Sequence, residues 1–450
     1  MGATVVAAEH NGRGAGAGRR RVVIVGGGFG GLTAAKALGK ADVDVTLIDR
    51  HSHHLFQPLL YQLACGGLSP AECATPIRAS VHRNDNVSVL MGAAQGLDAQ
   101  RGELLLDRGE RLPYDSLILA CGAQTSYFGN DAWCEHCYGL KTLADAVGLR
   151  NRIYGAFEMA ERASDAAERE RWMTFVVVGG GPTGVELAGE LSIITRHTMK
   201  GYYKRIDPKQ ARVILLDAGP RLVGAFSEHL SAKVAEYLRE LGVQIHQQAR
   251  VTAIDEHGVS FEIDGRAERI ATPTVVWGAG VQAAGLTEAV ATATGVERDR
   301  AGHLPVGEDL ALAGHPEISV IGDASKLAGP GGRPLPGLAT VAIQQARHVA
   351  HGIRRGAPGA QGPFHYLDKG ALAVVGRGKA ICEIRGHELS GRLAFLTYLS
   401  VHMYYLSGGG PGHRLKVLID WISTRVGSPQ DQVIDGELSS IEAPPPGARA

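Results

Sequence analysis

The sequence lacks the features that mark three classes of protein. Lys and Arg together number 46, as do Asp and Glu, so the basic excess of a nucleic-acid-binding protein is missing. Six cysteines in 450 residues are too few for a disulfide framework. No apolar run reaches about 18 residues, so no transmembrane helix is predicted. With 44% hydrophobic and 20% charged residues, the chain is predicted to be globular.

Glycine, in contrast, is abundant, with 61 residues. Two glycine clusters each follow a run of β-branched residues and precede a helical pattern and another strand. The four predicted strands lie at 22–25 and 43–48, and at 174–178 and 212–216. This order is typical of a βαβ unit that binds a dinucleotide. The sequence therefore predicts an α/β fold with two Rossmann-type domains, a number that suits this chain length.

The first glycine loop fits G-x-G-x-x-G at Gly26, Gly28 and Gly31. The first glycine permits a tight turn, the second lets backbone approach a pyrophosphate, and the third lets the helix pack on the strand. The helix N-terminus then offers N–H groups to the phosphates. Asp49 follows Gly26 by 23 positions and can accept hydrogen bonds from a ribose. The alternative is an ordinary glycine-rich turn.

The second loop fits the same pattern at Gly179, Gly181 and Gly184. Its acidic partner is predicted to be Asp217, which directly follows a strand but lies 38 positions after Gly179 instead of about 20. Residues 196–210 are interpreted as an insertion that lengthens the helix. If Asp217 holds the adenosine ribose, its charge disfavours a 2′-phosphate and predicts NADH over NADPH. The alternative is an aspartate that caps a turn.

Four motifs together resemble type II NADH dehydrogenase, the single-subunit, non-proton-pumping NADH:quinone oxidoreductase within the pyridine nucleotide–disulfide reductase superfamily. They are HHLFQPLLYQ at 53–62, GGGPTGVELAG at 179–189, IGDA at 321–324 and AIQQ at 342–345. The resemblance extends from about residue 21 to 426. It implies a hydride passed from NADH to FAD and two electrons passed on to a membrane quinone.

The resemblance also implies a domain order in which the NADH domain is inserted in the FAD domain. The expected parts are a disordered leader at 1–20, an FAD domain at 21–145 and 290–385, an NADH domain at 146–289, C-terminal anchoring helices at 386–426 and a flexible tail at 427–450.

Residues for each cofactor follow from the same resemblance. FAD is expected at Gly26, Gly28, Phe29, Gly30, Gly31, Asp49, Arg50, Gly122 and Asp323. NADH is expected at Gly179, Gly181, Thr183, Gly184, Glu186, Asp217 and Gly280. For Asp323 the alternative is an N-cap, and for Glu186 it is a carboxylate favoured only by the helix dipole.

Three positions are expected to act in catalysis, namely Glu186, Gln344 and Lys369, and quinone is expected at Thr340 and Gln344. Family members often carry a glutamine where this chain has Thr340, and threonine has a shorter reach. Lys369 resembles a family lysine near the flavin ring, although an ordinary loop lysine would look the same.

Helical apolar stripes occupy the C-terminal part of the chain. The first contains Leu389, Leu393, Leu396, Leu399, Met403 and Leu406, flanked by Phe395, Tyr398 and Tyr404; the second contains Leu415, Leu418, Ile419, Ile422 and Val426, with Trp421, Arg414, Lys416 and Arg425 nearby. From pattern alone, packing on the protein's own core or in a homodimer is the commoner arrangement. The resemblance instead implies monotopic attachment to the cytoplasmic side of the cell membrane.

A rival prediction within enzymes is a disulfide reductase or sulfide:quinone oxidoreductase, because Cys134 and Cys137 form a C-x-x-C. A second rival is a flavin-binding interaction module with little turnover. No His or Cys spacing predicts a metal site, since no second C-x-x-C or His pair accompanies the first. The sequence does not identify the quinone or the oligomeric state.

Overall fold

A computed structural model describes residues 18–329, 332, 334–356, 362–376, 378–406, 412 and 414–419. Most of the predicted leader and the whole predicted tail lie outside these residues. The chain packs into two compact units, each built from three segments. Unit 1 comprises Met1–His54, Thr75–Gln124 and Val281–Leu367, and unit 2 comprises Leu55–Ala74, Thr125–Gly280 and Asp368–Ala450.

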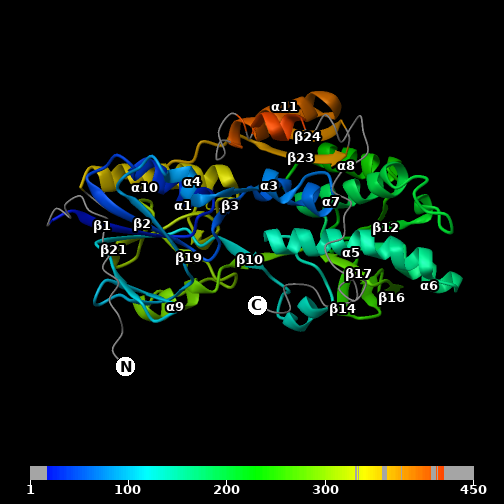
Figure 1. The fold of residues 1–450 in the computed structure, drawn as a ribbon, viewed down its shortest axis with the longest axis horizontal. Coiled ribbons are helices and arrows are strands. Elements are labelled where there is room, and N and C mark those ends of the chain that lie inside the picture. Colours follow the sequence, from blue (N-terminus) through cyan, green and yellow to red (C-terminus); the bar gives the residue numbers. More distant parts are fainter. Residues whose placement is uncertain are drawn as a thin grey trace. The chain divides into compact units, whose positions relative to one another are not determined.

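Unit 1 is built on a six-stranded sheet of order β20-β21-β9-β1-β2-β5 (Figure 1). Its strands are β1 (Arg20–Val25), β2 (Val43–Asp49), β5 (Val87–Met91), β9 (Ser116–Leu119), β20 (Ala311–Leu312) and β21 (His315–Val320). Strand β1 pairs in parallel with β2 and β9, and only β20 runs antiparallel to its neighbour. The predicted strands at 22–25 and 43–48 are confirmed.

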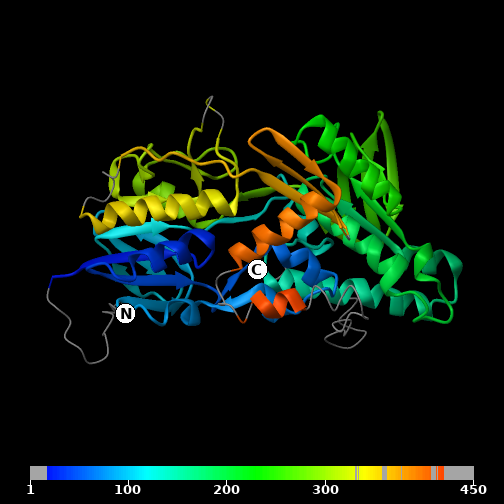
Figure 2. The same ribbon diagram turned by 90° about the horizontal axis from the view of Figure 1, so that it is seen from above.

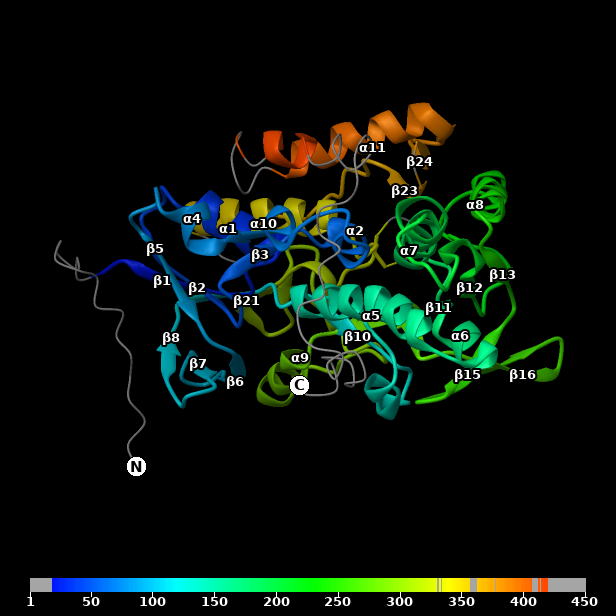
Figure 3. The same ribbon diagram turned by 45° about the vertical axis from the view of Figure 1, so that its right-hand side comes forward.

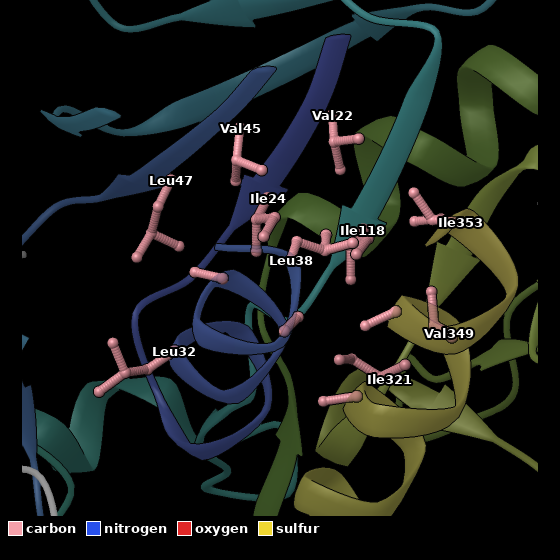
Figure 4. Close-up of a cluster of buried hydrophobic side chains, with 14 of the residues drawn as sticks. Val22, Ile24, Leu32, Leu38, Val45, Leu47, Ile118, Ile321, Val349 and Ile353 are labelled. Carbon is pink, nitrogen blue, oxygen red and sulfur yellow. The ribbon is translucent and has the colours of Figure 1, made fainter. Parts of the chain in front are cut away.

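Helices and a small second sheet pack against the two faces of this sheet. The helices are α1 (Phe29–Leu38), α4 (Ile77–Val81), α9 (Leu286–Thr294) and α10 (Ala339–Arg354), and a small sheet holds β6 (Ala94–Asp98), β7 (Glu103–Leu106) and β8 (Arg111–Pro113). Because side chains alternate along a strand, Val22 and Ile24 pack toward α1 and α10 (Figure 4). Val23 and Val25 pack on the opposite side with leucines of β6–β8. Figure 3 shows this small sheet on the side of β1 and β2 away from α1 and α10.

Unit 2 is built on a four-stranded parallel sheet of order β13-β12-β11-β17. Its strands are β11 (Thr174–Val178), β12 (Arg212–Leu216), β13 (Gln244–His246) and β17 (Thr274–Trp277), and an antiparallel sheet adds β14 (Arg250–Asp255), β15 (Gly258–Ile263) and β16 (Arg266–Ala271). The helices are α2 (Leu60–Ala64), α3 (Pro70–Cys73), α5 (Leu143–Arg162), α6 (Ala166–Trp172), α7 (Pro182–Ile193), α8 (Glu228–Glu240) and α11 (Gly391–Tyr405). Both strands predicted for this βαβ unit are confirmed.

Helix α11 lies beside a third sheet of unit 2, which is formed by β23 (Ala371–Gly376), β24 (Lys379–Ile384) and β25 (His387–Ser390). Figure 2 shows this helix and the three strands in orange, side by side. Short strands complete the chain: β3 (His53–Leu55), β4 (Ala74–Pro76), β10 (Ala123–Thr125), β18 (Val281–Ala283), β19 (Leu304–Pro305) and β22 (Ser325–Lys326). Among the described residues, no helix has the length and apolar character needed to cross a membrane.

The predicted lengthening of the second-loop helix is only partly right. Helix α7 ends at Ile193 and continues as a single π turn, Ile194–Thr198. The chain then leaves the helix, and the Glu161 carboxylate accepts hydrogen bonds from the backbone N–H groups of Lys204, Arg205 and Ile206. In a continuing helix, these N–H groups would donate to backbone carbonyls. Because the Glu161 carboxylate accepts from them instead, the insertion forms a side loop.

The packing units depart from the predicted cofactor domains. Residues 55–74, 125–145 and 368–385, predicted in the FAD domain, pack in unit 2, and residues 281–289, predicted in the NADH domain, pack in unit 1. The Tyr154 hydroxyl on α5 donates to the Cys65 carbonyl at 2.8 Å. Helix α7 approaches β23 so closely that a Cβ added to Gly189 would lie 2.3 Å from the Val375 oxygen. These contacts draw two distant segments onto the second Rossmann unit.

Candidate dinucleotide-binding sites

The first glycine loop has the geometry of a phosphate cradle. Gly26 has φ +103°, and a Cβ there would lie 2.2 Å from the Ala120 oxygen. A Cβ on Gly31 would lie 1.7 Å from the Gly26 oxygen. At Gly28, in contrast, an added Cβ would meet nothing within 4 Å. The outer glycines therefore maintain the fold, whereas Gly28 marks the open side where a phosphate can approach the backbone.

The N-terminus of α1 also fits an anion. The helix begins at Phe29, and its N-cap, Gly28, has no side chain to cap the first N–H groups. Those groups and the positive end of the helix dipole are therefore available to a ligand. Since the pyrophosphate of a dinucleotide is the group such a terminus holds, the loop residues, Phe29 and Gly30 included, fit FAD.

Asp49 supports this loop directly. One carboxylate oxygen accepts from the Gly27 N–H at 2.6 Å, and the other accepts from the His51 N–H at 2.7 Å. Burial alone would raise the pKa of Asp49, but hydrogen bonds from His51 and Gly27 outweigh it and hold that pKa below its usual value. Asp49 is thus a charged acceptor at the end of β2.

Two residues without an assigned role from sequence also hold the first site. The His54 Nδ1 lies 2.9 Å from the Gly27 carbonyl, which only accepts, so this nitrogen donates. Burial lowers the pKa of His54 and keeps the ring neutral. The buried Gln345 accepts from the Gly322 N–H at 2.7 Å and so fixes the turn that carries Asp323. The motifs at 53–62 and 342–345 contained both residues. Their roles could not be predicted, because each side chain bonds to backbone that is distant in the sequence.

The remaining residues expected at FAD lie in unit 1. Gly122 has φ +70° in the turn after β9, and an added Cβ there would meet nothing within 4 Å. Arg50 follows Asp49 and is exposed. Asp323 lies in a 3₁₀ turn, Gly322–Ala324, that follows β21. Strands β21, β9 and β1 are neighbours in parallel, so their carboxyl ends bring these turns to one edge of the sheet.

The second loop repeats the first in detail. Gly179 has φ +109°, and its added Cβ would lie 2.7 Å from the Ala279 backbone. A Cβ on Gly184 would lie 1.9 Å from the Gly179 oxygen, while one on Gly181 would meet nothing within 4 Å. Helix α7 starts at Pro182, with Thr183 exposed in its first turn and no side-chain cap. This loop is therefore a second cradle for a pyrophosphate.

The structure pairs Asp217 with the second loop. Its carboxylate accepts from the Gly180 N–H at 3.0 Å, just as Asp49 accepts from the N–H of Gly27. The spacing of 38 positions reflects the side loop after the π turn, because Asp217 still directly follows the strand next to β11. Its position therefore matches that of Asp49, and it is available as the acidic partner of an adenosine ribose.

Glu186 lies in the second turn of α7 and is half-buried. Its carboxylate accepts from the Val374 N–H on β23 at 3.3 Å. Burial raises the pKa of Glu186 to about 8, and the single backbone hydrogen bond does not offset this effect. The side chain therefore retains a proton at neutral pH, which a surface glutamate would not do.

The polar groups expected at the quinone already have protein partners. The Gln344 amide accepts from the Leu367 N–H and donates to the Leu367 carbonyl, each at 3.0 Å. The Thr340 hydroxyl lies 3.0 Å from the Tyr366 hydroxyl. In unit 2, Lys369 donates to the Tyr405 hydroxyl at 3.3 Å. These contacts give Gln344 and Thr340 a clear role in holding 366–367 against α10.

The C-x-x-C has the environment of structural thiols. Cys137 is buried and its Sγ donates to the Trp133 carbonyl at 3.1 Å. Burial raises the pKa of both Cys134 and Cys137, so the reactive thiolate is disfavoured. All six cysteines are free. Across the described ranges, no cluster of three His, Cys, Asp or Glu side chains is placed to hold a metal.

The chain is similar in sequence to known proteins. The family model of pyridine nucleotide-disulphide oxidoreductases matches residues 20–346. The type II NADH:quinone oxidoreductase Ndh of Mycobacterium tuberculosis is 44% identical over 422 residues, 91% of this chain and 89% of the relative. NdhA of the same organism is 43% identical, with 92% of this chain and 89% of the relative covered.

Solved structures show the same fold. NDH2 from Plasmodium falciparum, in complex with NADH, superposes with a TM-score of 0.83 at 20% identity, covering 93% of this chain and 100% of that one. The sulfide:quinone oxidoreductase from Aquifex aeolicus gives a TM-score of 0.68 at 18% identity, covering 89% and 94%. The predicted α/β fold is thereby confirmed. The chain belongs to the pyridine nucleotide–disulphide oxidoreductases and, within them, to the type II NADH:quinone oxidoreductases.

Proposed function

We propose that this chain catalyses the transfer of a hydride from NADH to FAD and of two electrons onward to a membrane quinone, without pumping protons. The observation that carries the proposal is the presence of two matched cradles, each with an open middle glycine and an acidic strand-end partner. Two such cradles fit two dinucleotides. The relatives named above act, by name, on NADH and quinone.

The first cradle is assigned to FAD and the second to NADH. The turn that carries Asp323 lies at the same sheet edge as the first cradle, where it can contact a ligand beyond the pyrophosphate. When bound, FAD supplies the redox chemistry, because it takes up a hydride and releases electrons in pairs. The chain's own residues bind, orient and hold protons.

An anaerobic titration of the purified holoprotein tests this function. NADH is expected to bleach the flavin absorbance, and a soluble quinone is expected to restore it. Parallel additions of sulfide and of a dithiol should leave the spectrum unchanged. A flavin that sulfide bleaches but NADH does not would replace the proposal with a sulfide:quinone oxidoreductase. A flavin that NADH bleaches and quinone fails to reoxidise would favour an interaction module with little turnover.

We assign Glu186 as the proton-holding group of the second unit, and its raised pKa predicts a pH effect on stability. The folded protein keeps the proton up to about pH 8, whereas the unfolded carboxyl loses it near pH 4.5. The protonated carboxyl therefore makes its full contribution to the free energy of unfolding below the unfolded pKa. That contribution is lost as the pH rises through the folded pKa. Glu186→Gln should remove this decline, which is about 2 kcal/mol after a discount for partial exposure.

Thermal unfolding of both proteins, measured from about pH 5 to about pH 9, checks this prediction. The difference between their melting temperatures should shift in favour of Glu186→Gln as pH rises. A constant difference would mean that Glu186 titrates in the ordinary range. The same variant should raise KM for NADH or lower kcat, since we infer that Glu186 contributes to the NADH site.

Replacing Cys134 and Cys137 together with serine should leave NADH:quinone activity within about twofold of the parent. The physical reason is that burial keeps both thiols protonated and therefore poor nucleophiles. Steady-state turnover with a soluble quinone is the measurement, and the single variant Cys382→Ser serves as the matched control. A loss of activity confined to the double variant would revive the dithiol mechanism.

We further propose that the C-terminal part of unit 2 lies on a membrane. The outward residues of the first stripe and its flanks are Leu389, Leu393, Leu396 and Tyr404, exposed by 37%, 66%, 59% and 63%. The inward face of α11 consists of Ala394, Phe395, Tyr398 and His402, all buried. In the described residues, the outward part of the stripe therefore does not pack on the protein's own core, whereas Leu399 and Met403 are half-buried and Leu406 is buried.

The described residues of the second stripe extend this surface. Val417 is fully buried, and Lys416 forms an ion pair with Glu72, which is 2% exposed. Leu415, Leu418 and Ile419 remain exposed. Trp421, Ile422, Arg425 and Val426 lie outside the described residues. An exposed apolar surface with adjacent cations suits the membrane interface, and a homodimer contact is the alternative outcome.

The proposed membrane attachment bears on the three residues expected near the quinone, Thr340, Gln344 and Lys369. A lipid-soluble quinone would reach the protein from the bilayer, on its cytoplasmic side. We propose that Thr340 and Gln344 act by fixing 366–367, and that Lys369 acts through its contact with Tyr405 on α11.

A further inference from the structure

Phe128 is an exposed aromatic residue in an unfavourable backbone conformation. Its side chain is 66% exposed, and its φ is +53°. Bulky L-residues rarely adopt this left-handed region. Such a conformation persists only where the surroundings hold it, and it concentrates at ligand sites. Neither the sequence motifs nor the proposed mechanism gives Phe128 a role.

Unit 2 holds the segment around Phe128 from both sides. The Ser126 N–H donates to the Gly280 carbonyl at 3.1 Å, and the Trp277 indole N–H donates to the Ser126 carbonyl at 2.8 Å. Further along, the Tyr138 N–H donates to the Val275 carbonyl at 2.9 Å. The segment is thus fastened to β17 and to the turn that follows it.

The Phe128 ring lies against that turn. A Cβ added to Gly280 would be 2.5 Å from the Phe128 Cζ, so the ring occupies the space of the missing side chain. The same ring packs edge-on against Trp277, with centroids 6.2 Å apart. The turn also borders the cradle, because Ala279 lies against Gly179. Gly280, expected at NADH from sequence, therefore makes room for an aromatic ring.

The strand order decides which half of NADH lies near this ring. The sheet runs β13-β12-β11-β17. Asp217 directly follows β12 and is available to the adenosine ribose, and the cradle after β11 takes the pyrophosphate. A dinucleotide that crosses the carboxyl edge of the sheet then extends toward β17. The half that arrives at Gly280 is the nicotinamide half.

We propose that the Phe128 ring packs against the nicotinamide ring of NADH and orients it. The proposal rests on the proposed placement of NADH in the second cradle. A planar, apolar ring surface fixed at the rim of the site offers contact area to another planar ring at low entropic cost. The strained backbone is what directs this surface outward.

Two ligands can distinguish the effect of this contact on binding from the effect of the rest of the site. NAD⁺ contains the nicotinamide ring, and ADP-ribose is the same molecule without it. Their inhibition constants against NADH are measured for Phe128→Asn, since asparagine tolerates a positive φ while lacking the ring. Phe128→Gly is the second variant. The controls are Asp217→Ala and Tyr202→Ala, the latter an exposed aromatic of unit 2.

Phe128→Asn is expected to weaken NAD⁺ about tenfold, a typical loss for one aromatic stack, and to leave ADP-ribose unchanged. Asp217→Ala should weaken both ligands, and Tyr202→Ala neither. If Asp217→Ala weakens neither, the placement of NADH fails. If Asp217→Ala behaves as expected but both Phe128 variants leave NAD⁺ unchanged, or weaken ADP-ribose equally, the contact with nicotinamide is overturned and the placement stands.

Discussion

Gly28→Ala is expected to abolish FAD retention in a protein that still folds, whereas Gly31→Ala is expected to prevent unit 1 from folding. At Gly28 the backbone has φ −71° and an added Cβ meets nothing within 4 Å, so alanine fits the protein. That methyl group would instead occupy the side from which a phosphate approaches. The dissociation constant for FAD should rise roughly 100-fold.

At Gly31 the same methyl group would lie 1.7 Å from the Gly26 oxygen. Backbone cannot move away as a flexible side chain can, so helix α1 would have to shift from β1. We expect a loss of about 4 kcal/mol or more in stability. Flavin absorbance after gel filtration and thermal unfolding distinguish the two variants. If Gly28→Ala retained FAD at parental affinity, the first cradle would not be a pyrophosphate site.

The pair Gly181→Ala and Gly184→Ala repeats this experiment in unit 2. Because the added Cβ is free at Gly181 and would lie 1.9 Å from backbone at Gly184, the same contrast is expected for NADH. Gly181→Ala should keep its FAD and lose NADH affinity. This double contrast tests the assignment of one cofactor to each cradle.

Leu393→Glu combined with Leu396→Glu is expected to release the protein from membranes without unfolding it. Both side chains are more than half exposed and project from α11 away from its buried face. Each glutamate removes apolar area from the interface and adds a charge that resists burial. The partition coefficient should fall by at least about tenfold for each substitution.

Flotation with vesicles of phosphatidylethanolamine and phosphatidylglycerol measures the effect. Met91→Glu is the matched control, since Met91 is 69% exposed in unit 1. These substitutions are a sharper test than deletion of 386–450, which would also remove Phe395, Tyr398 and His402 from the packed face of α11. Binding that persists would place the anchor elsewhere. A dimer that the double variant converts to a monomer would show that the surface is a protein interface.

The sequence alone predicted those features of the fold and the sites that depend on a few neighbouring residues. The two cradles were predictable because Gly26, Gly31, Gly179 and Gly184 encode the positive φ angles and close backbone approaches that they require. Strands flanking each loop were predictable for the same reason, since β-branched runs favour extended structure wherever they occur. The apolar stripe at 389–406 was also predictable. The sequence did not decide whether the stripe faces the protein core or a membrane, because either environment favours apolar residues at helical spacing.

Asp217 was predicted from its strand context, and the packing of β12 beside β11 explains why its long spacing from Gly179 does not matter. Four features were decided only by tertiary packing. The Glu186 pKa is raised because the folded unit buries its carboxyl. Gln344 is held by a backbone turn 23 residues away, α11 buries one face on unit 2, and Phe128 gains its position from Gly280 and Trp277. Backbone geometry is a property of a few consecutive residues, whereas burial and partnership depend on which elements meet, and a single local pattern does not contain that information.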